Sequence, residues 1–138
     1  MEPVHKHLLI SGTVKLLPNK MIKEPQMAKF ALNVENVVEK WLDDLVNLVK
    51  MRIFIPARAR YCSTYGNEGV TGIISLETSH ASIHFWDQDK SFKFDLYSCQ
   101  DFDVDTVIKH LNKFDLEKYS YKVIDRDTNE VVGHGGNN

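Results

Sequence analysis

The stretch ETSHASIHFWDQDKSFKFDLYSC, residues 77–99, is the part of the sequence that decides the fold. Polar and apolar residues alternate through residues 81–86 and again through 92–97, and an alternation of period two predicts half-buried strands. The polar residues 87–90 between them leave room only for a tight turn. Two strands joined by so short a turn pair antiparallel, so the stretch predicts a β-hairpin.

Two segments outside this hairpin have the spacing of amphipathic helices. In the first, which begins at residue 34, Asn33 can cap the start. Its apolar face consists of Val37, Val38, Trp41, Leu42, Leu45, Leu48 and Val49. The second helix follows Asp103 or Asp105, either of which can cap it.

Further strands are predicted where β-branched and aromatic residues gather between turn residues. These strands cover residues 7–14, 51–55, 70–76 and 119–124. Pro56 is expected to end the second of them. Residues 15–31 carry two prolines and little periodicity, which predicts a loop, and the tail at residues 133–138 is expected to be disordered.

The predicted order is strand, helix, several strands in succession, helix, strand. Successive strands with short turns pair antiparallel, and two amphipathic helices can cover one sheet face. We therefore predict an α+β fold: a two-layer sandwich, with a mainly antiparallel sheet and two helices on one face. The length fits a single domain, residues 1–138. The uncovered sheet face must meet a ligand or a second subunit, and a homodimer is expected.

Composition argues against several classes of partner. The formal net charge of −2 gives no electrostatic case for binding nucleic acid. No apolar run approaches membrane-spanning length, and the N-terminus lacks the pattern of a secretion signal. The two cysteines, Cys62 and Cys99, predict no disulfide framework, and a cytoplasmic location is expected.

The hairpin concentrates side chains that do nucleophilic and proton-transfer chemistry. They are Ser79, His80, Ser82, His84 and Cys99. Because strand side chains alternate, the even-numbered members of residues 80–84 are expected on the uncovered face, and the odd-numbered ones in the core. Simple exposure to solvent also produces such a polar row, so that interpretation stays open.

Metal binding and hydrolysis are weaker interpretations of the same residues. His80 and His84 would lie about 13 Å apart along a strand, too far to share one ion. No CxxC or HExxH pattern is present, so no metal is predicted. A hydrolase would need an orienting third group, and no GxSxG pattern occurs. Without such a role, Cys99 is a small buried hydrophobe.

Taken together, these residues resemble a known enzyme family, the small prokaryotic-type S-adenosylmethionine decarboxylases. Residues 78–88, TSHASIHFWDQ, are similar to the family motif ESHL(S/T)IHTWPE, and residues 95–99, DLYSC, to the D(L/V)FTC strand that follows it. The interval from serine to cysteine matches without a gap. Residues 69–72, GVTG, and 6–9, KHLL, resemble the family's GVSG and RHL. The resemblance implies an α/β sandwich, in agreement with the predicted order.

Members of this family are made as self-cleaving proenzymes. The resemblance implies that the Ser79 hydroxyl attacks the carbonyl of Thr78, and that the ester breaks by β-elimination to leave a pyruvoyl group derived from Ser79. Residues 1–78 and 79–138 would then be the β and α chains of one folded unit. Decarboxylation needs an electron sink, which no side chain provides. The implied substrate is S-adenosylmethionine, and the product supplies aminopropyl groups for spermidine synthesis.

The resemblance also implies individual roles. Ser79 provides the carbonyl that takes the substrate amine, and His84 moves protons during self-processing. Cys99 is the acid that protonates Cα after carbon dioxide leaves, a role that suits a thiol because the unperturbed pKa of thiols lies within reach of neutrality.

Substrate contacts are implied for three further residues. Tyr65 falls where the family stacks an aromatic ring on adenine, although a turn tyrosine without contacts is the other interpretation. Thr71 corresponds to the serine of GVSG, where a plain strand residue is the alternative. Gln88 stands where a glutamate is expected to bind the ribose hydroxyls.

Departures from the family motif leave other functions open. Thr78 replaces a glutamate, residues 87–88 (DQ) replace Pro-Glu, and residues 63–64 (ST) replace a His-Arg pair. The altered ribose motif leaves open a pyruvoyl decarboxylase of ornithine or arginine. Thr78 leaves open an uncleaved, non-catalytic relative that binds a nucleoside.

Overall fold

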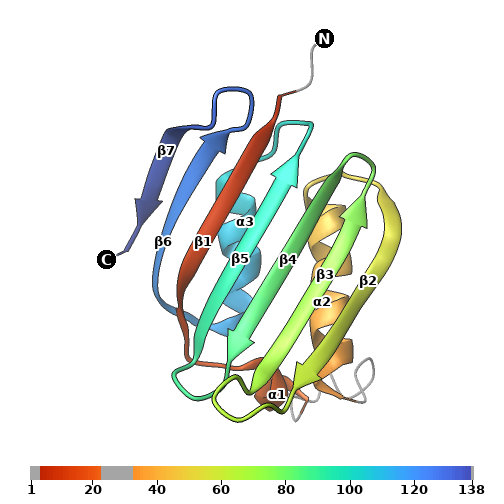
Figure 1. Cartoon of the computed structure of the whole chain (residues 1–138), viewed down its shortest axis with the longest axis vertical. Helices are drawn as coiled ribbons and strands as arrows, with labels where there is room; N and C mark the ends of the chain where they lie inside the picture. The colour runs from red at the N-terminus through yellow and green to blue at the C-terminus, as the bar shows by residue number, and fades with distance from the viewer. Residues whose placement is uncertain (1–3, 23–32, 138) are drawn as a thin grey trace.

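Among the described residues, one antiparallel sheet of seven strands organises the molecule (Figure 1). The structure, a computed structural model, describes residues 4–22 and 33–137. The strands lie in the order β2-β3-β4-β5-β1-β6-β7. They are β1 (Lys6–Val14), β2 (Ile53–Cys62), β3 (Gly69–Leu76), β4 (Ser79–Trp86), β5 (Ser91–Ser98), β6 (Leu116–Asp125) and β7 (Glu130–Gly136). The predicted hairpin is confirmed as β4 and β5, near the middle of the sheet.

Two amphipathic helices cover one face of this sheet. They are α2 (Val34–Leu48) and α3 (Val104–Leu111), while α1 (Pro18–Met21) is a single turn. Figure 1 shows α2 behind β2 and β3, and α3 behind β1 and β5. Asn33 caps α2 by accepting a hydrogen bond from the Asn36 N–H, and Asp103 caps α3 through the Asp105 N–H. The predicted two-layer α+β sandwich is confirmed. None of the helices described is long and apolar enough to cross a membrane.

An aromatic cluster around Trp41 joins the helices to the sheet. The Trp41 ring stacks on His110 with ring centroids 4.4 Å apart and meets Phe94 of β5 edge-on. The Trp41 indole N–H donates to the His110 carbonyl (3.0 Å), and His110 Nε2 donates to the Trp41 carbonyl (2.7 Å). Burial lowers the pKa of the His110 imidazole below its ordinary value of 6.5.

The buried His110 predicts a pH-dependent stability. Because the pKa of His110 is lower in the folded state than in the unfolded state, protons bind preferentially to the unfolded chain near pH 6. The contribution of His110 to the free energy of unfolding is therefore complete above about pH 6.5, and it declines as the pH falls below that value. We expect urea unfolding to show a larger loss of stability between pH 7.5 and 5 for the wild type than for His110→Phe. Equal losses in the two proteins would contradict this prediction.

The sequence predicted that β2 would end at Pro56, but the strand continues to Cys62. β2 lies at the edge of the sheet, where a residue without an N–H can face outward and remove no ladder hydrogen bond. The register with β3 shifts between Ile55 and Arg58, so the strand accommodates the proline at an irregularity.

The predicted disordered tail, residues 133–138, is wrong for its first four residues, because β7 includes them and pairs with β6. A Cβ atom on Gly135 would lie 2.5 Å from the Tyr121 ring, so the glycine permits a close approach of the two strands. The predicted loop, residues 15–31, is wrong over α1, and residues 23–31 lie outside the described part of the chain.

Candidate active site

The sheet face turned away from the helices carries three rows of mainly polar residues across β3, β4, β5 and β1. The rows are Thr71, His84, Lys93 and Ser11; then Ile73, Ser82, Asp95 and Leu9; then Ser75, His80, Tyr97 and His7. The odd-numbered residues 81, 83 and 85 of β4 are buried against the helices, whereas its even-numbered residues are less buried. The predicted alternation of the two faces is therefore confirmed.

Ser79 begins β4 directly after a turn with strained backbone geometry. Leu76 pairs with Ser79, which leaves only Glu77 and Thr78 to connect β3 with β4. Thr78 adopts a φ of +56°, a left-handed conformation that β-branched residues rarely take. Such a conformation costs about 1–3 kcal/mol. The strain lies in the residue that precedes Ser79.

Cys99 lies beside this turn. The Cys99 backbone N–H donates to the Ser79 Oγ (3.1 Å), and the Ser79 Oγ lies 3.8 Å from the Cys99 Sγ. The Thr78 Oγ1 lies 2.7 Å from the same sulfur and donates to the Glu77 carbonyl (2.6 Å). Ser79 is 8% exposed. A hydroxyl, a thiol and a strained peptide unit therefore meet at one end of β4.

His84 and Thr71 form a second group farther along the same strands. They are cross-strand partners on β4 and β3, and the Thr71 Oγ1 lies 2.9 Å from the His84 Nδ1. Ser79 and His84 are five residues apart on one strand, which corresponds to about 17 Å. The structure therefore brings Ser79 together with Cys99, and His84 together with Thr71, but does not bring the two pairs together.

Tyr65 and Gln88 lie at the same end of the sheet as His84. They line a cavity of about 420 Å³ between the β2–β3 loop and the β4–β5 turn, together with Tyr61, Gly66, Glu68 and Asp87. Tyr65 is 96% exposed, so its ring is open to a ligand. The Tyr61 hydroxyl donates to Asp87 (2.6 Å), and this hydrogen bond raises the pKa of Tyr61 to about 12.

The structure brings His7, His80 and Asp95 together in a cluster that was not predicted from the sequence. His7 Nε2 lies 2.7 Å from the Asp95 Oδ2, and His80 Nε2 lies 3.5 Å from it. Their ligand atoms all lie within 4.8 Å of one another, a spacing that a metal ion could use. Only the register of β1, β5 and β4 reveals the cluster, because no short sequence motif contains all three residues.

Hydrogen bonding around this cluster opposes a metal. Arg126 Nη1 lies 2.9 Å from the His7 Nδ1, and a guanidinium can only donate. His7 Nδ1 therefore accepts, and Nε2 carries the proton that it donates to Asp95. If a metal bound to Nε2, the ring proton would have to move to Nδ1. There it would face the positively charged guanidinium of Arg126, which is unfavourable. Asp95 also accepts from the Ser82 hydroxyl. The arrangement favours a hydrogen-bond network over metal ligation.

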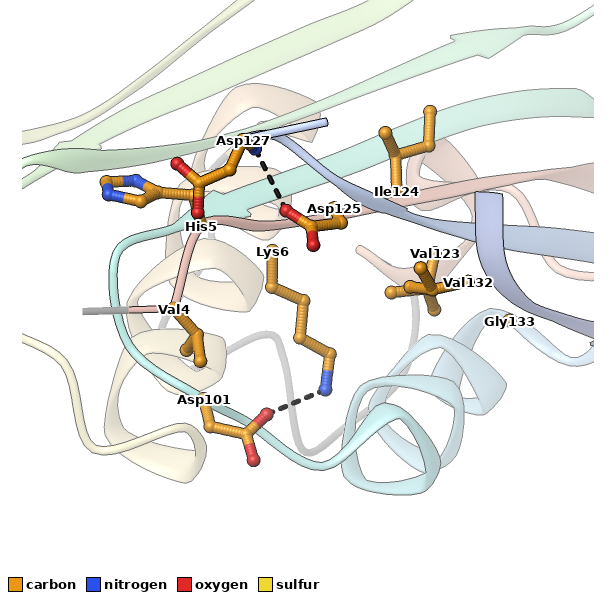
Figure 2. A pocket seen from close by; sticks show the side chains of 10 residues that line it. All are labelled: Val4, His5, Lys6, Asp101, Val123, Ile124, Asp125, Asp127, Val132 and Gly133. Atoms are coloured by element: carbon orange, nitrogen blue, oxygen red, sulfur yellow. Dashed lines mark hydrogen bonds and ion pairs between the residues drawn. The ribbon is translucent and has the colours of Figure 1, made fainter. Parts of the chain in front are cut away.

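A cavity of about 460 Å³ between β1 and the β6–β7 hairpin contains none of the predicted site residues (Figure 2). Val123 and Val132 form an apolar side, while Lys6 is held by Asp101 at 2.8 Å. The Asp127 N–H likewise donates to Asp125 at 2.9 Å. Among the described residues that line this cavity, the one lysine or arginine, Lys6, is thus paired with Asp101, and Asp125 accepts from a backbone N–H, so the Ser79 end of β4 remains the better candidate site.

Comparisons with known proteins identify the class of protein. The family model described as S-adenosylmethionine decarboxylase matches residues 24–127. The chain is 30% identical over 107 residues to an S-adenosylmethionine decarboxylase proenzyme of Archaeoglobus fulgidus, an alignment that covers 76% of this chain and 88% of that protein. The chain belongs to the S-adenosylmethionine decarboxylase family, and this membership supports decarboxylase activity.

Proposed function

We propose that this chain is a self-processing decarboxylase of S-adenosylmethionine that depends on a pyruvoyl group made from Ser79. The observation that carries the proposal is the group formed by Ser79, the strained Thr78 before it, and Cys99. Processing divides the single domain into a β chain, residues 1–78, and an α chain, residues 79–138. The decarboxylated product is an aminopropyl donor for spermidine synthesis. Both cysteines are free thiols, which supports a reducing cytoplasmic location.

Cleavage begins when the Ser79 Oγ attacks the carbonyl carbon of Thr78. The peptide C–N bond breaks as the ester C–O bond forms, and the freed amine takes up a proton. Loss of the Ser79 Cα proton then breaks the Cβ–O bond, and Thr78 leaves as a carboxylate. Tautomerisation and hydrolysis of the remaining enamine release ammonia and leave a ketone. The left-handed conformation of Thr78 favours the first step, because cleavage relieves its strain.

The residues at the start of β4 fit a pyruvoyl group. Ser79 is nearly buried, and the Cys99 N–H points at its side-chain oxygen from 3.1 Å, so this end of the strand can hold the group beside the thiol. When formed, the group supplies the electrophilic carbonyl and the electron sink that decarboxylation needs. The partly exposed Cys99 can then deliver a proton to the substrate Cα.

We expect Cys99→Ala to separate processing from turnover. The variant keeps the Ser79 hydroxyl and the Cys99 backbone N–H, so cleavage should remain largely intact. Loss of a general acid should lower turnover by about 100-fold or more. Intact mass measures cleavage, and carbon dioxide release measures turnover. Cys62→Ala is the matched control and should change neither. Normal turnover by Cys99→Ala would show that the thiol is not the proton donor.

A homodimer that joins two open sheet faces can resolve the separation of Ser79 from His84. One proton transfer cannot span about 17 Å within a chain. A two-fold axis parallel to the open face and perpendicular to β4 would lay the Ser79 end of one protomer against the His84 end of its partner. Ile73 and Leu9, which are 55% and 37% exposed, provide apolar surface for this contact in the middle row.

The substrate proposal is supported by the cavity that contains Tyr65 and Gln88. The exposed Tyr65 ring can stack on a purine, and the Gln88 amide can hydrogen-bond a ribose. Thr71 does not line this cavity but contacts His84 on the open face. In the family motif a glutamate stands where this chain has Gln88, and it is expected to bind the ribose hydroxyls. The neighbouring Asp87 already accepts a hydrogen bond from Tyr61, so its carboxylate does not simply take over that role. That observation favours a pyruvoyl decarboxylase of ornithine or arginine as the second candidate.

Carbon dioxide release from processed protein distinguishes the candidates. We expect release from carboxyl-labelled S-adenosylmethionine, and none above background from ornithine or arginine. Release only from one of the latter would establish the second candidate. A chain that stays uncleaved after prolonged incubation at neutral pH, yet binds an adenosine nucleoside, would instead identify a non-catalytic relative.

A further inference from the structure

The Thr78 side chain is engaged with Cys99 in a way that the cleavage chemistry does not require. The Thr78 Oγ1 lies 2.7 Å from the Cys99 Sγ and 2.6 Å from the Glu77 carbonyl oxygen. The left-handed backbone of Thr78 holds the hydroxyl in this position. Attack by Ser79 uses only the carbonyl of Thr78, so the hydroxyl has no role in that step.

We propose that Thr78 is a positioning residue whose hydroxyl restrains the Cys99 thiol in the uncleaved chain, and that cleavage after Thr78 releases this thiol. The proposal rests on the proposed function for the cleavage, but the contact itself is independent of it. The proton donor and the ketone would therefore become available in the same event.

The direction of the hydrogen bonds explains the restraint. The single Thr78 hydroxyl proton is donated to the Glu77 carbonyl, so the hydroxyl oxygen can only accept from the Cys99 S–H. The Glu77 carbonyl oxygen lies 4.0 Å from the sulfur and also offers no proton. The Ser79 hydroxyl lies farther from the same sulfur than the Thr78 hydroxyl does, at 3.8 Å. The contact therefore engages the Cys99 S–H and holds the sulfur against the Thr78 hydroxyl.

Cleavage removes the covalent restraint on this contact. Once the C–N bond between Thr78 and Ser79 is broken, Thr78 is the last residue of the β chain and no longer bridges β3 and β4. Its backbone is then free to leave the left-handed conformation that directs the hydroxyl to the sulfur. Cys99 remains at the end of β5, beside the start of β4, with its thiol free to meet a substrate.

Alkylation of Cys99 in uncleaved protein tests the restraint. We compare Ser79→Ala with Thr78→Val/Ser79→Ala and Thr78→Ser/Ser79→Ala, which differ only at residue 78. Iodoacetamide labelling is followed by peptide mass spectrometry, with Cys62 as the internal reference. Loss of one neutral hydrogen bond should raise the Cys99 rate about three- to tenfold in the valine variant. The serine variant, which restores the hydroxyl, should match Ser79→Ala, and the Cys62 rate should stay constant.

A second measurement follows the thiol through cleavage itself. In wild-type protein sampled during processing, Cys99 should be alkylated faster in cleaved molecules than in uncleaved ones. The ratio of these two rates should be at least as large as the rate increase that Thr78→Val causes in the Ser79→Ala background. Equal Cys99 rates in the valine and serine variants, or in cleaved and uncleaved wild type, would overturn the inference. Those results would leave the proposed function intact. Wild-type protein that never cleaves would overturn the function, while the variant comparison would still decide the role of Thr78.

Discussion

Ser79→Ala is expected to remain a single chain of about 15.9 kDa, whereas the wild type separates into residues 1–78 and 79–138. Alanine lacks the hydroxyl that attacks the Thr78 carbonyl, so neither the ester nor the ketone can form. Carbon dioxide release should fall to background together with cleavage. Intact mass spectrometry reports the cleavage, and the α chain of the wild type should resist N-terminal sequencing because it carries no free amine.

Ser82→Ala is the matched control for this result. Ser82 lies on the same strand but on the open face, where its hydroxyl donates to Asp95 rather than meeting the turn at Thr78. It should therefore still be cleaved. A Ser79→Ala chain that splits at the same bond, or a wild type whose α chain begins with an ordinary serine, would contradict the pyruvoyl mechanism.

The second large effect is expected from mixing two inactive proteins. Ser79→Ala lacks the nucleophile and His84→Ala lacks the imidazole, so each alone should be inactive. If the site is composite, a mixed dimer contains one complete site, with Ser79 and Cys99 from the second variant and His84 from the first. Half the dimers formed at random are mixed and one of their two sites is complete, so co-expression should restore about one quarter of wild-type activity.

The control for this experiment is a mixture of Ser79→Ala with Cys99→Ala. Both residues lie in the same group at one end of β4, so neither arrangement of the mixed dimer completes a site with wild-type turnover. Recovery only in the first mixture supports a site shared between protomers. Absence of recovery in a verified mixed dimer would place both groups in one chain's site and would contradict the shared arrangement.

Much of the layer structure could be predicted because it depends on local patterns. The alternation of residues 81–86 requires a strand with one buried face, and the apolar face of α2 requires a surface to cover. Asn33 and Asp103 could be predicted as N-caps, because the first backbone N–H groups of a helix need a hydrogen-bond acceptor. The pairing of Ser79 with Cys99 could also be expected, because Ser79 begins one strand of a hairpin and Cys99 directly follows the other.

Other features depend on neighbours that are distant in sequence. Pro56 is tolerated because β2 lies at the sheet edge, and Gly135 belongs to a strand because Tyr121 packs closely against it. Neither partner is visible in the local pattern. The network of His7, Asp95 and Arg126 likewise depends on the registers of several strands, which local spacing does not specify.

The amino-acid sequence by itself determined the antiparallel hairpin, the two covering helices and the serine-to-cysteine spacing, because each follows from periodicity or from residues within one hairpin. Beyond the pairing of Ser79 with Cys99, only the tertiary structure decided which functional side chains meet. It puts Thr78 in a left-handed turn against the Cys99 thiol and leaves His84 with Thr71 at the far end of β4. The physical reason is that strand direction and register, not residue identity, determine where side chains on one sheet face come together.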